Sequence, residues 1–389
     1  MQERHAIYLD SSAGTLIEKE HLAEVSNALG RAGLDLGNPS SPHAHGRAAK
    51  SVLLSAGSRI IQSVNAPSDS SVVLTSSGTE ANQLAITSAF AQARTRHKRP
   101  HWILSAGEHD SVERLVTPFT SAGGRVDLIP LDSSGNPRLD LLEELRTPET
   151  CLLSLIWVHN ETGVISDVEF AARWAQSHGI PLQVDAAQAW GRVPMDLGQL
   201  GAPYVCVSGS KIGAFSGTGA VICGPSVGLH AQILGSQARG ARGGTENVLG
   251  ALSLGLCAEK IAEKLVWEAG GAHALKLTLE GEVLKRIPGA RVHGGSARRV
   301  AGISSFGFEG IEREGLVTGL DLMGYSVSAG SACAAGSAEA SKTLQAMGWS
   351  AAQAKGSLRV SPGPASALDV TQFVTDLLTV ISRLRKVHS

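Results

Sequence analysis

Seven short runs of apolar and β-branched residues, separated by stretches with helical periodicity, constrain the fold of this chain more than any other feature. The runs expected to form strands are 71–75, 101–105, 126–130, 151–158, 181–184, 204–207 and 219–223. Helical patterns lie between them, for example at 80–94, 139–145 and 168–178. Strands that alternate with helices predict an α/β fold, with a mainly parallel seven-stranded sheet covered by helices on both faces.

The pattern changes near Asn247, where one long helix is expected to run to about Glu268 before mixed α and β elements follow. At roughly 150 residues per domain, a chain of this length is expected to hold more than one domain. We therefore predict a large domain over residues 15–255. A smaller α+β domain would combine residues 1–14 with residues 256–389.

Charge and cysteine content narrow the classes of function. The chain has 34 basic and 35 acidic residues and no cluster of basic ones, so neither a nucleic acid nor a membrane surface is an expected partner. None of the five cysteines forms a CxxC pair, and three lie in apolar runs, as expected for reduced thiols in the cytoplasm. No apolar run is long enough to span a bilayer, so we predict a soluble enzyme of small-molecule chemistry.

Polar, glycine-rich segments follow five of the predicted strands. Ligands of open α/β sheets bind at these carboxyl ends of the strands, so we expect the five segments to meet at one edge. The segments are SSGTEAN from residue 76, GEHDS from 107, HNETG from 159, DAAQA from 185 and SGSKIG from 208. The first could hold a phosphate at a helix N-terminus, although Ser77 and Glu80 also fit an ordinary helix cap.

Two of these segments carry residues suited to pyridoxal chemistry. Asp185 could keep a pyridine nitrogen protonated, although an aspartate at this place also fits a helix cap. Lys211 would be desolvated behind a buried strand, which lowers the pKa of an amine and favours Schiff-base formation. The alternative for Lys211 is a solvated loop lysine. The order of phosphate loop, His109, Asp185 and Lys211 favours the first interpretation.

The joint pattern resembles the class V, fold-type I pyridoxal-phosphate enzymes, and among them the cysteine desulfurases of the NifS and IscS kind. The resemblance runs over nearly the whole chain. The motifs that carry it are YLDSSAGT, GNPSSPHAHGR, TSSGTEANQLAI, EHDSV, HNETGVI, VDAAQAWGRVPMDL, SGSKIG, ARGGTENVLG, GSACAAGS and SLRVSPG. It implies a fold-type I homodimer with pyridoxal 5'-phosphate as its cofactor and with each site completed across the interface. No metal is expected.

The resemblance also implies the role of each site residue. Lys211 would bind the cofactor as a Schiff base and move protons at the substrate Cα, His109 would stack on the ring, and Cys333 would attack the substrate sulfur. Asp185 would pair with the ring nitrogen and Gln188 with the phenolic oxygen. Further cofactor contacts are expected from Gly78, Thr79, Asn160, Ser208 and Ser210, and from Thr245 of the partner subunit. The substrate carboxylate would be bound by Arg359 together with Asn38 and Asn160.

The implied reaction removes sulfur from L-cysteine, or a related amino acid, to give L-alanine and a persulfide on Cys333. Cys333 lies among small residues, which predict a mobile and exposed segment. The persulfide would pass to a sulfur-acceptor protein, for example in iron–sulfur cluster biogenesis, tRNA thiolation or cofactor biosynthesis.

Three departures from the family pattern leave alternatives open. Ser210 stands where the family usually has histidine, and the segments IGAFSGTGAV and DSSAGT also differ. Ser210 can still donate one hydrogen bond to a phosphate. The alternatives are another class V activity, such as a selenocysteine lyase or C–S lyase, and a cofactor-binding but catalytically impaired partner in a sulfur pathway.

Overall fold

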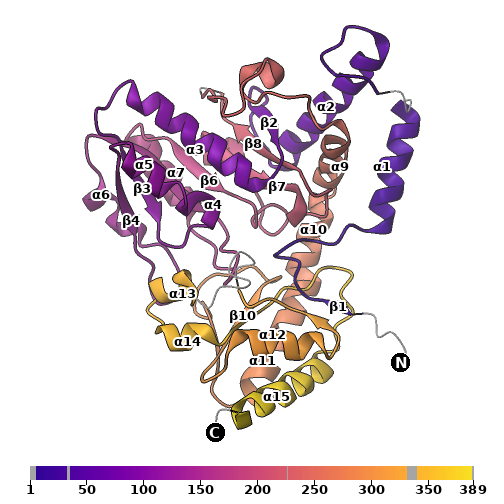
Figure 1. Ribbon diagram of the computed structural model, residues 1–389, viewed down its shortest axis with the longest axis vertical. Coiled ribbons are helices and arrows are strands. Elements are labelled where there is room, and N and C mark those ends of the chain that lie inside the picture. The colour runs from indigo at the N-terminus through magenta and orange to yellow at the C-terminus, as the bar shows by residue number, and fades with distance from the viewer. Residues whose placement is uncertain (1–5, 33–35, 226, 331–339, 388–389) are drawn as a thin grey trace.

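A seven-stranded sheet forms the centre of the upper half of the molecule in Figure 1, a computed structural model that describes residues 6–32, 36–225, 227–330 and 340–387. The strand order is β2-β8-β7-β6-β5-β3-β4. Strand β8 runs antiparallel to β2 and β7, and the other neighbours are parallel. The bounds are β2 Ser71–Thr75, β3 His101–Ser105, β4 Arg125–Ile129, β5 Thr150–Ile156, β6 Leu182–Asp185, β7 Tyr204–Ser208 and β8 Gly219–Cys223. The predicted α/β fold is confirmed.

Burial explains why the central strands are apolar at nearly every position. Each residue of β3, β5, β6, β7 and β8 is buried, whereas the edge strands β2 and β4 contain exposed residues. Successive side chains of a strand point to opposite faces, so Val205 and Val207 join one apolar cluster while Tyr204 and Cys206 join the other. Both faces of the sheet are therefore covered, as expected for a parallel sheet.

Helices cover the two faces from opposite sides. Helix α3 (Gly78–Arg94) contributes to the cluster on one face, and α7 (Val168–Ser177) and α9 (Val248–Glu259) contribute to the cluster on the other. The remaining helices of this half are α1 Lys19–Ala32, α2 Ala44–Ser63, α4 Asp110–Glu113, α5 Val116–Ser121, α6 Leu142–Leu145 and α8 Leu197–Leu200, with 3₁₀ turns at Leu139–Leu141, Gly209–Lys211 and Gln237–Gly240.

The lower half has a core of its own, with Phe306, Phe308 and Phe373 fully buried in it. Its sheets are β12-β10-β9 and the parallel pair β1-β11. The elements are β1 Ile7–Tyr8, α11 His273–Arg286, β9 Ala290–Val292, β10 Ser304–Phe308, α12 Arg313–Asp321, β11 Tyr325–Ser326, α13 Lys342–Ala346, α14 Ala351–Lys355, β12 Ser357–Val360 and α15 Val370–Val387. The separate core supports a division into domains, and the boundaries at residues 14/15 and 255/256 stay predictions.

The single long helix expected from Asn247 to Glu268 is wrong. At Lys260 the backbone leaves α-helical geometry (φ −94°, ψ 9°) and ends α9, and α10 (Ile261–Trp267) begins at the next residue. A π-helical turn at Glu268–Ala272, which contains Gly270 and Gly271, then leads into α11. Apolar periodicity continues through this region, so the pattern alone does not reveal where the backbone changes.

Four cysteines lie in the part of the chain that the structure describes, and all four are buried and free of disulfides: Cys151, Cys206, Cys223 and Cys257. The first three lie in β5, β7 and β8, as their apolar surroundings predict. Among the described residues, no helix has both the length and the apolar character needed to cross a membrane.

Candidate active site

The carboxyl ends of β2, β3, β5, β6 and β7 lie at one edge of the large sheet, because these strands run in the same direction. This arrangement confirms the expectation that the five polar segments meet. Strands β6 and β7 are neighbours, so Asp185 at the end of β6 and Lys211 just after β7 come close together. The edge faces the lower half of the molecule (Figure 1).

The amine of Lys211 is held by two backbone carbonyls from the N-terminal segment. Its Nζ donates to the carbonyl of Ala13 at 2.6 Å and to that of Ser12 at 3.0 Å. Burial, together with the positive charges of Arg359 and Arg192, lowers the pKa of Lys211 to about 8. A substantial fraction of this amine is neutral near physiological pH, which is the state a nucleophilic amine requires. Lys211 is therefore not a solvated loop lysine.

The carboxylate of Asp185 lies in a buried network of hydrogen bonds. Asn82 Nδ2 donates to its Oδ2 at 2.7 Å, and the backbone N–H of Ala187 donates to its Oδ1 at 2.9 Å. Gln183 Nε2 donates to Asn82 Oδ1, which fixes the orientation of the amide. These hydrogen bonds orient the carboxylate at the end of β6, where it can pair with a cationic group.

His109 caps helix α4 and is linked to the same network. The backbone N–H of Ser111 donates to His109 Nδ1 at 3.1 Å, so Nε2 carries the proton of the neutral ring. The Ser111 hydroxyl also accepts a hydrogen bond from Asn82, the residue that binds Asp185. Ser111 and Asn82 thus link His109 to Asp185 through hydrogen bonds. The stacking role of His109 stays a prediction.

Glu108 is a buried carboxyl group that no sequence pattern distinguishes from the rest of its motif. Its Oε1 accepts the backbone N–H of Ile156 at 2.8 Å, and its Oε2 is buried without a hydrogen-bond partner among the described residues. Burial, with the charge of Asp185, raises the pKa of Glu108 to about 8. At neutral pH Glu108 is therefore mainly protonated.

The raised pKa of Glu108 predicts that the effect of Glu108→Gln on stability depends on pH. A raised pKa in the folded state stabilises the protein below the ordinary pKa of about 4.5, and that contribution is lost as the pH rises to about 8. We expect the unfolding free energy of the wild type to fall relative to the variant across this range, by at most roughly 1.4 kcal/mol per pH unit. Urea unfolding at several pH values measures the difference.

The matched control is Glu169→Gln, which changes an exposed glutamate at the start of α7. Its unfolding free energy should run parallel to that of the wild type between pH 4.5 and pH 8. Parallel curves for Glu108→Gln as well would contradict the protonated state of Glu108.

The segment after β2 packs closely against the end of β7. A Cβ on Gly78 would lie 3.0 Å from Ser208 Cβ, and a Cβ on Gly219 would lie 2.5 Å from the carbonyl carbon of Ser77. The Ser208 and Ser210 hydroxyls lie 3.2 Å apart, and Thr79 is exposed at the first turn of α3. Backbone N–H groups at a helix N-terminus and nearby hydroxyls suit an anion such as phosphate.

The cap interpretation of the same segment is also correct in part. Ser77 Oγ accepts the backbone N–H of Glu80 at 3.1 Å. The Glu80 carboxylate does not return to Ser77, because it accepts hydrogen bonds from Ser76 and from Arg242 instead. The helix cap and the anion site use different donors, so they are compatible.

Arg359 is the most buried charged group at this edge, with only 1% of its side chain exposed. Its Nη2 donates to Asp10 Oδ1 at 2.7 Å, and its Nη1 donates to the carbonyl of Asn160 at 2.9 Å. Its Nε is buried and has no hydrogen-bond partner among the described residues. Arg359 is therefore not a surface salt bridge, and it keeps a donor for a further anion.

The other predicted site residues differ in their exposure and in their hydrogen-bond partners. Gln188 Nε2 donates to the carbonyl of Ser12, which also accepts from Lys211. Gln188 Oε1 is buried and finds no hydrogen-bond partner in the part of the chain that the structure describes. Asn38 and Thr245 are exposed, and within the described part of the chain no hydrogen bond joins them to the other predicted site residues. Cys333 lies outside the described residues. The roles of these residues stay predictions.

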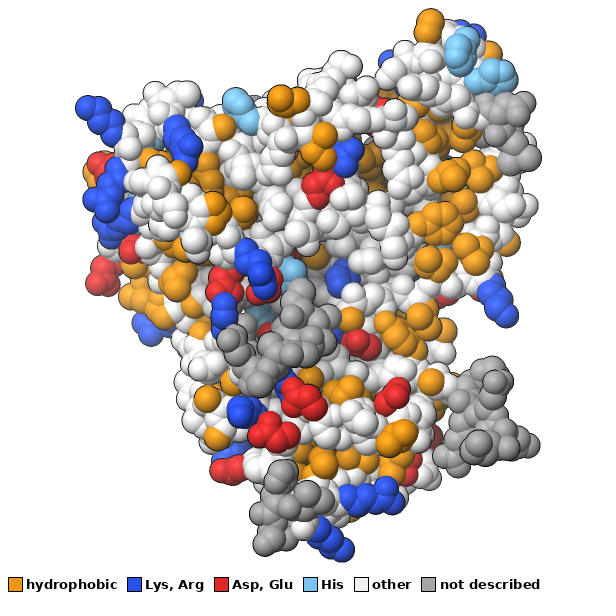
Figure 2. Space-filling view, in the orientation of Figure 1, with side chains coloured by type: hydrophobic (Ala, Val, Ile, Leu, Met, Phe, Trp, Pro, Cys, Tyr) orange, Lys and Arg blue, Asp and Glu red, His pale blue; other side chains and the backbone are white. Residues whose placement is uncertain are grey.

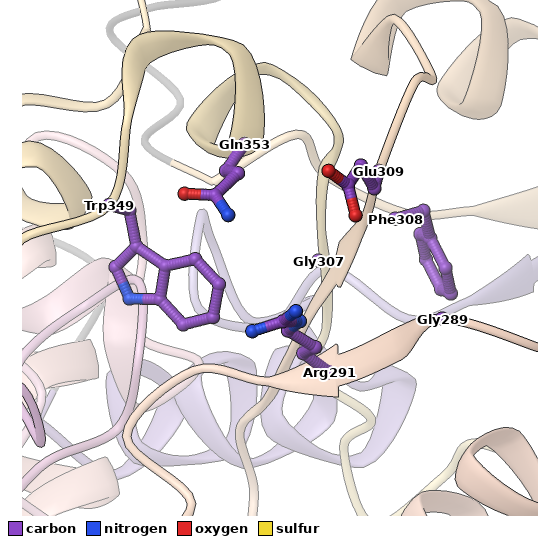
Figure 3. A pocket seen from close by; sticks show the side chains of 7 residues that line it. All are labelled: Gly289, Arg291, Gly307, Phe308, Glu309, Trp349 and Gln353. Carbon is purple, nitrogen blue, oxygen red and sulfur yellow. The ribbon is translucent and has the colours of Figure 1, made fainter.

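A small pocket in the lower half of the molecule is a separate feature (Figure 3). Its lining includes Arg291, Trp349 and Gln353, and the Arg291 guanidinium lies 5.8 Å from the centre of the Trp349 ring. None of the predicted site residues lines this pocket. The chemistry-bearing groups are gathered at the sheet edge instead.

Comparisons with known proteins agree with this arrangement. Residues 7–369 match the family model described as aminotransferase class V. The chain belongs to this family.

Named relatives narrow the class further. A cysteine desulfurase of Cereibacter sphaeroides is 34% identical over 97% of this chain and 96% of its own length. The cysteine desulfurase NifS of Azotobacter vinelandii is 31% identical over 98% of this chain and 94% of its own length. The solved structure of a NifS-like protein from Rickettsia africae superimposes with a TM-score of 0.85 at 25% identity, covering 98% of this chain and all of that one.

Proposed function

We propose that this protein is a cysteine desulfurase that uses pyridoxal 5'-phosphate to convert L-cysteine to L-alanine and leaves the sulfur as a persulfide on Cys333. The observation that carries the proposal is the half-buried amine of Lys211, with its lowered pKa, one strand away from the buried carboxylate of Asp185. The names of the relatives favour this activity over a selenocysteine lyase, a C–S lyase or an impaired partner protein.

The residues at the sheet edge fit the proposed cofactor. Lys211 would hold its aldehyde, Asp185 its ring nitrogen, and the N-terminus of α3 with Ser208 and Ser210 its phosphate. The buried Gln188 Oε1, which has no hydrogen-bond partner among the described residues, marks a polar position that a bound group could satisfy. When bound, this cofactor withdraws electrons from the Cα of an amino acid and so makes the Cα proton removable.

The side chains of this chain would supply the remaining functions. Arg359 would bind the substrate carboxylate through its other guanidinium nitrogens and through Nε, for which the described residues provide no partner. Lys211 Nζ, whose pKa is about 8, would accept the Cα proton and return it at neutral pH. Ser210 would replace the usual histidine with one hydroxyl, and its position 3.2 Å from Ser208 supports that role.

The sulfur transfer balances without any further oxidant. The thiolate of Cys333 attacks the substrate sulfur, an S–S bond forms, and the substrate C–S bond breaks. The substrate carbon is reduced, because hydrogen replaces sulfur on it, and the two sulfur atoms together are oxidised to a persulfide. One thiol and one cysteine thus become one persulfide and one alanine. A sulfur-acceptor protein, or an added thiol, would then regenerate Cys333.

Cys333→Ala tests this mechanism. We expect sulfide release from L-cysteine, in the presence of an added thiol, to fall to background while the visible absorption of the bound cofactor is retained. Lead-acetate or methylene-blue detection of sulfide, together with quantification of alanine, measures the loss. Selenocysteine and cysteine sulfinate offered beside L-cysteine compare the rival class V activities.

Cys151→Ala is the control, because it removes a thiol that lies buried in β5. Its sulfide release should match that of the wild type. A Cys333→Ala enzyme that releases sulfide at the wild-type rate would exclude the persulfide mechanism, and a purified protein that stays colourless after the cofactor is added would exclude the function itself.

We also propose that the protein works as a homodimer. Hydrophobic side chains gather on the face over α1 and α9 at the right of Figure 2. The exposed large apolar residues of these elements and of neighbouring segments include Leu16, Ile17, Leu22, Leu54 and Leu249. A clustered apolar surface of this kind is typical of a protein–protein interface. A dimer would also give Thr245 and Asn38, which are exposed here, a place in the partner's site. Sedimentation velocity measures the oligomeric state.

The cytoplasmic location and the identity of the sulfur acceptor stay predictions. Free, buried thiols in β5, β7 and β8 support a reducing environment. The acceptor would approach Cys333 and is expected to be a protein of a sulfur-transfer pathway.

A further inference from the structure

The buried side-chain amide of Asn82 connects two segments that would contact the ring of the proposed cofactor. Asn82 lies on α3, four residues and so about one helical turn after Gly78, and only 2% of the residue is exposed. It is not one of the predicted site residues, and the proposed chemistry gives it no role. Its hydrogen-bond partners include Asp185 at the end of β6 and Ser111 on α4, which belong to these two segments.

Both polar atoms of the Asn82 side chain are engaged. Its Nδ2 lies 2.7 Å from Asp185 Oδ2 and 2.9 Å from Ser111 Oγ, and it donates to both. Its Oδ1 accepts from Gln183 Nε2 at 2.9 Å. A side-chain amide has two hydrogens to donate, so each of them is directed to a different segment. One planar group therefore fixes the position of Asp185 relative to that of Ser111.

The orientation of the Asn82 amide is determined from two sides. Gln183 is fully buried, and its Nε2 donates to the oxygen of Asn82. On the other side lies the carboxylate of Asp185, which only accepts hydrogen bonds. A reversed Asn82 amide would place an oxygen against Asp185 Oδ2 and would leave that oxygen without this donor. The observed orientation is therefore the one that presents the nitrogen to Asp185.

The second hydrogen bond of Asn82 leads to His109. Because Ser111 Oγ accepts from Asn82, its own hydrogen can be donated to His109 Nδ1, which lies 2.9 Å away. The backbone N–H of Ser111 also donates to His109 Nδ1, at 3.1 Å. His109 is thus held by Ser111, and the hydroxyl group of Ser111 is in turn held by Asn82.

Burial makes this network sensitive to the loss of any member. Asn82, Ser111, Gln183 and Asp185 are each at most 4% exposed, so a group that loses its partner cannot turn to bulk water. A buried polar group that is left unsatisfied costs more free energy than a typical hydrogen bond contributes. Without Asn82, the hydrogen bond from the backbone N–H of Ala187 to Asp185 would remain, and Oδ2 would lose its donor.

We propose that Asn82 is a positioning residue for the cofactor ring: its amide orients the Asp185 carboxylate and, through Ser111, the His109 side chain. Because Asn82 lies on α3, it also fixes both residues relative to the helix N-terminus where the phosphate would bind. The inference rests on the proposed function, in which Asp185 and His109 contact the ring. An electrostatic group acts most strongly when it is held in place before the reaction, and Asn82 supplies this preorganisation.

Two measurements on the full-length protein test the proposal. Titration of the cofactor-free protein with pyridoxal 5'-phosphate, followed by absorption, gives the dissociation constant of the cofactor. Exchange of the Cα hydrogen of L-alanine for deuterium, followed by NMR at saturating cofactor, measures proton removal without involving Cys333. For Asn82→Ala we expect the dissociation constant to rise roughly 10-fold and the exchange to slow by roughly 10- to 100-fold, as for loss of a hydrogen bond to a charged group.

Two double-mutant cycles distinguish positioning from a general structural effect. In Asp185→Asn the acceptor is neutral, so adding Asn82→Ala should slow the exchange by only about 3-fold or less. Ser111→Ala breaks only the connection to His109 and should slow the exchange about 3- to 10-fold, but less than about 2-fold when it is added to His109→Ala. A residue that only supports the fold would give the same factor in every background.

Asn136→Ala is the matched control. The Asn136 amide also donates to a carboxylate, that of Asp132 at 3.1 Å, but this pair lies in the loop after β4. The dissociation constant and the exchange rate of this variant should equal those of the wild type. Circular dichroism and thermal unfolding establish which variants are folded.

Failure of this inference can be distinguished from failure of the proposed function. A wild type that does not bind the cofactor on Lys211, or does not exchange the Cα hydrogen, would exclude the proposed function. If the wild type does both, wild-type values in Asn82→Ala would exclude the positioning role alone, and so would an equally large factor in Asp185→Asn. If Asn82→Ala does not fold, Ser111→Ala decides: wild-type exchange, or slowing that persists in His109→Ala, would exclude the role.

Discussion

Lys211→Ala is expected to give a folded protein that lacks the visible absorption band of the bound cofactor and converts L-cysteine to alanine roughly 10²- to 10⁴-fold more slowly. The variant loses both the amine that would hold the cofactor and the group that would move the Cα proton. Absorption spectra after addition of pyridoxal 5'-phosphate, with sulfide and alanine assays, measure both losses. Borohydride reduction and peptide mapping of the wild type should place the label on Lys211.

Lys276→Ala is a matched control for this experiment. Burial also lowers the pKa of Lys276 to about 8, but its Nζ donates to the carbonyl of Val300 in the lower half of the molecule. This variant should keep the absorption band and the activity. A band that persists in Lys211→Ala, or a label on another residue, would overturn the proposed site.

Asp185→Asn has the second-largest expected effect. The amide keeps the size of the side chain but removes the negative charge, so the cofactor ring nitrogen would lose its counterion. We expect the absorption band to be retained and alanine formation to slow by about 10²- to 10³-fold, as for loss of one preorganised electrostatic group. Steady-state assays at a fixed pH measure the change, with the visible spectrum as the measure of cofactor occupancy.

The control for Asp185→Asn addresses the alternative of a helix-capping aspartate. Asp167 caps α7, where its Oδ1 accepts the backbone N–H of Phe170 at 2.9 Å. Asparagine caps a helix about as well as aspartate, so Asp167→Asn should leave the activity unchanged. An Asp185→Asn enzyme of wild-type activity would show that Asp185 has only a structural role.

The fold was predictable because its signal is local. Each strand of the large sheet needs a short apolar run, and a parallel sheet needs a helix between strands, so the order along the chain already contains the architecture. The strand Gly219–Cys223 was predicted with the bounds that the structure has, and Ser71–Thr75 and His101–Ser105 likewise. The break at Lys260 was missed because it changes backbone angles without interrupting the apolar pattern.

The sequence allowed the main site residues to be selected, but it did not reveal what surrounds their side chains. Lys211 and Asp185 could be selected because each follows an apolar strand in a recognisable motif. The ion pair between Asp10 and Arg359 joins residues from opposite ends of the chain, and no local pattern marks such a contact. Glu108 and Glu161 have unusual electrostatic surroundings only because other segments bury them. The motifs that contain Glu108 and Glu161 were recognised in the sequence, but neither glutamate was selected as a site residue.

The pairing of β1 with β11 has a consequence for the order of events during translation. Ile7 pairs with Tyr325, and Ser11 donates two hydrogen bonds to the carbonyl of Ser361, so these contacts of the N-terminal segment cannot form until almost the entire chain has left the ribosome. The carbonyls of Ser12 and Ala13 that hold the Lys211 amine belong to this segment. The pairing that fixes this segment is therefore completed late in synthesis, and nascent chains arrested before residue 325 lack it.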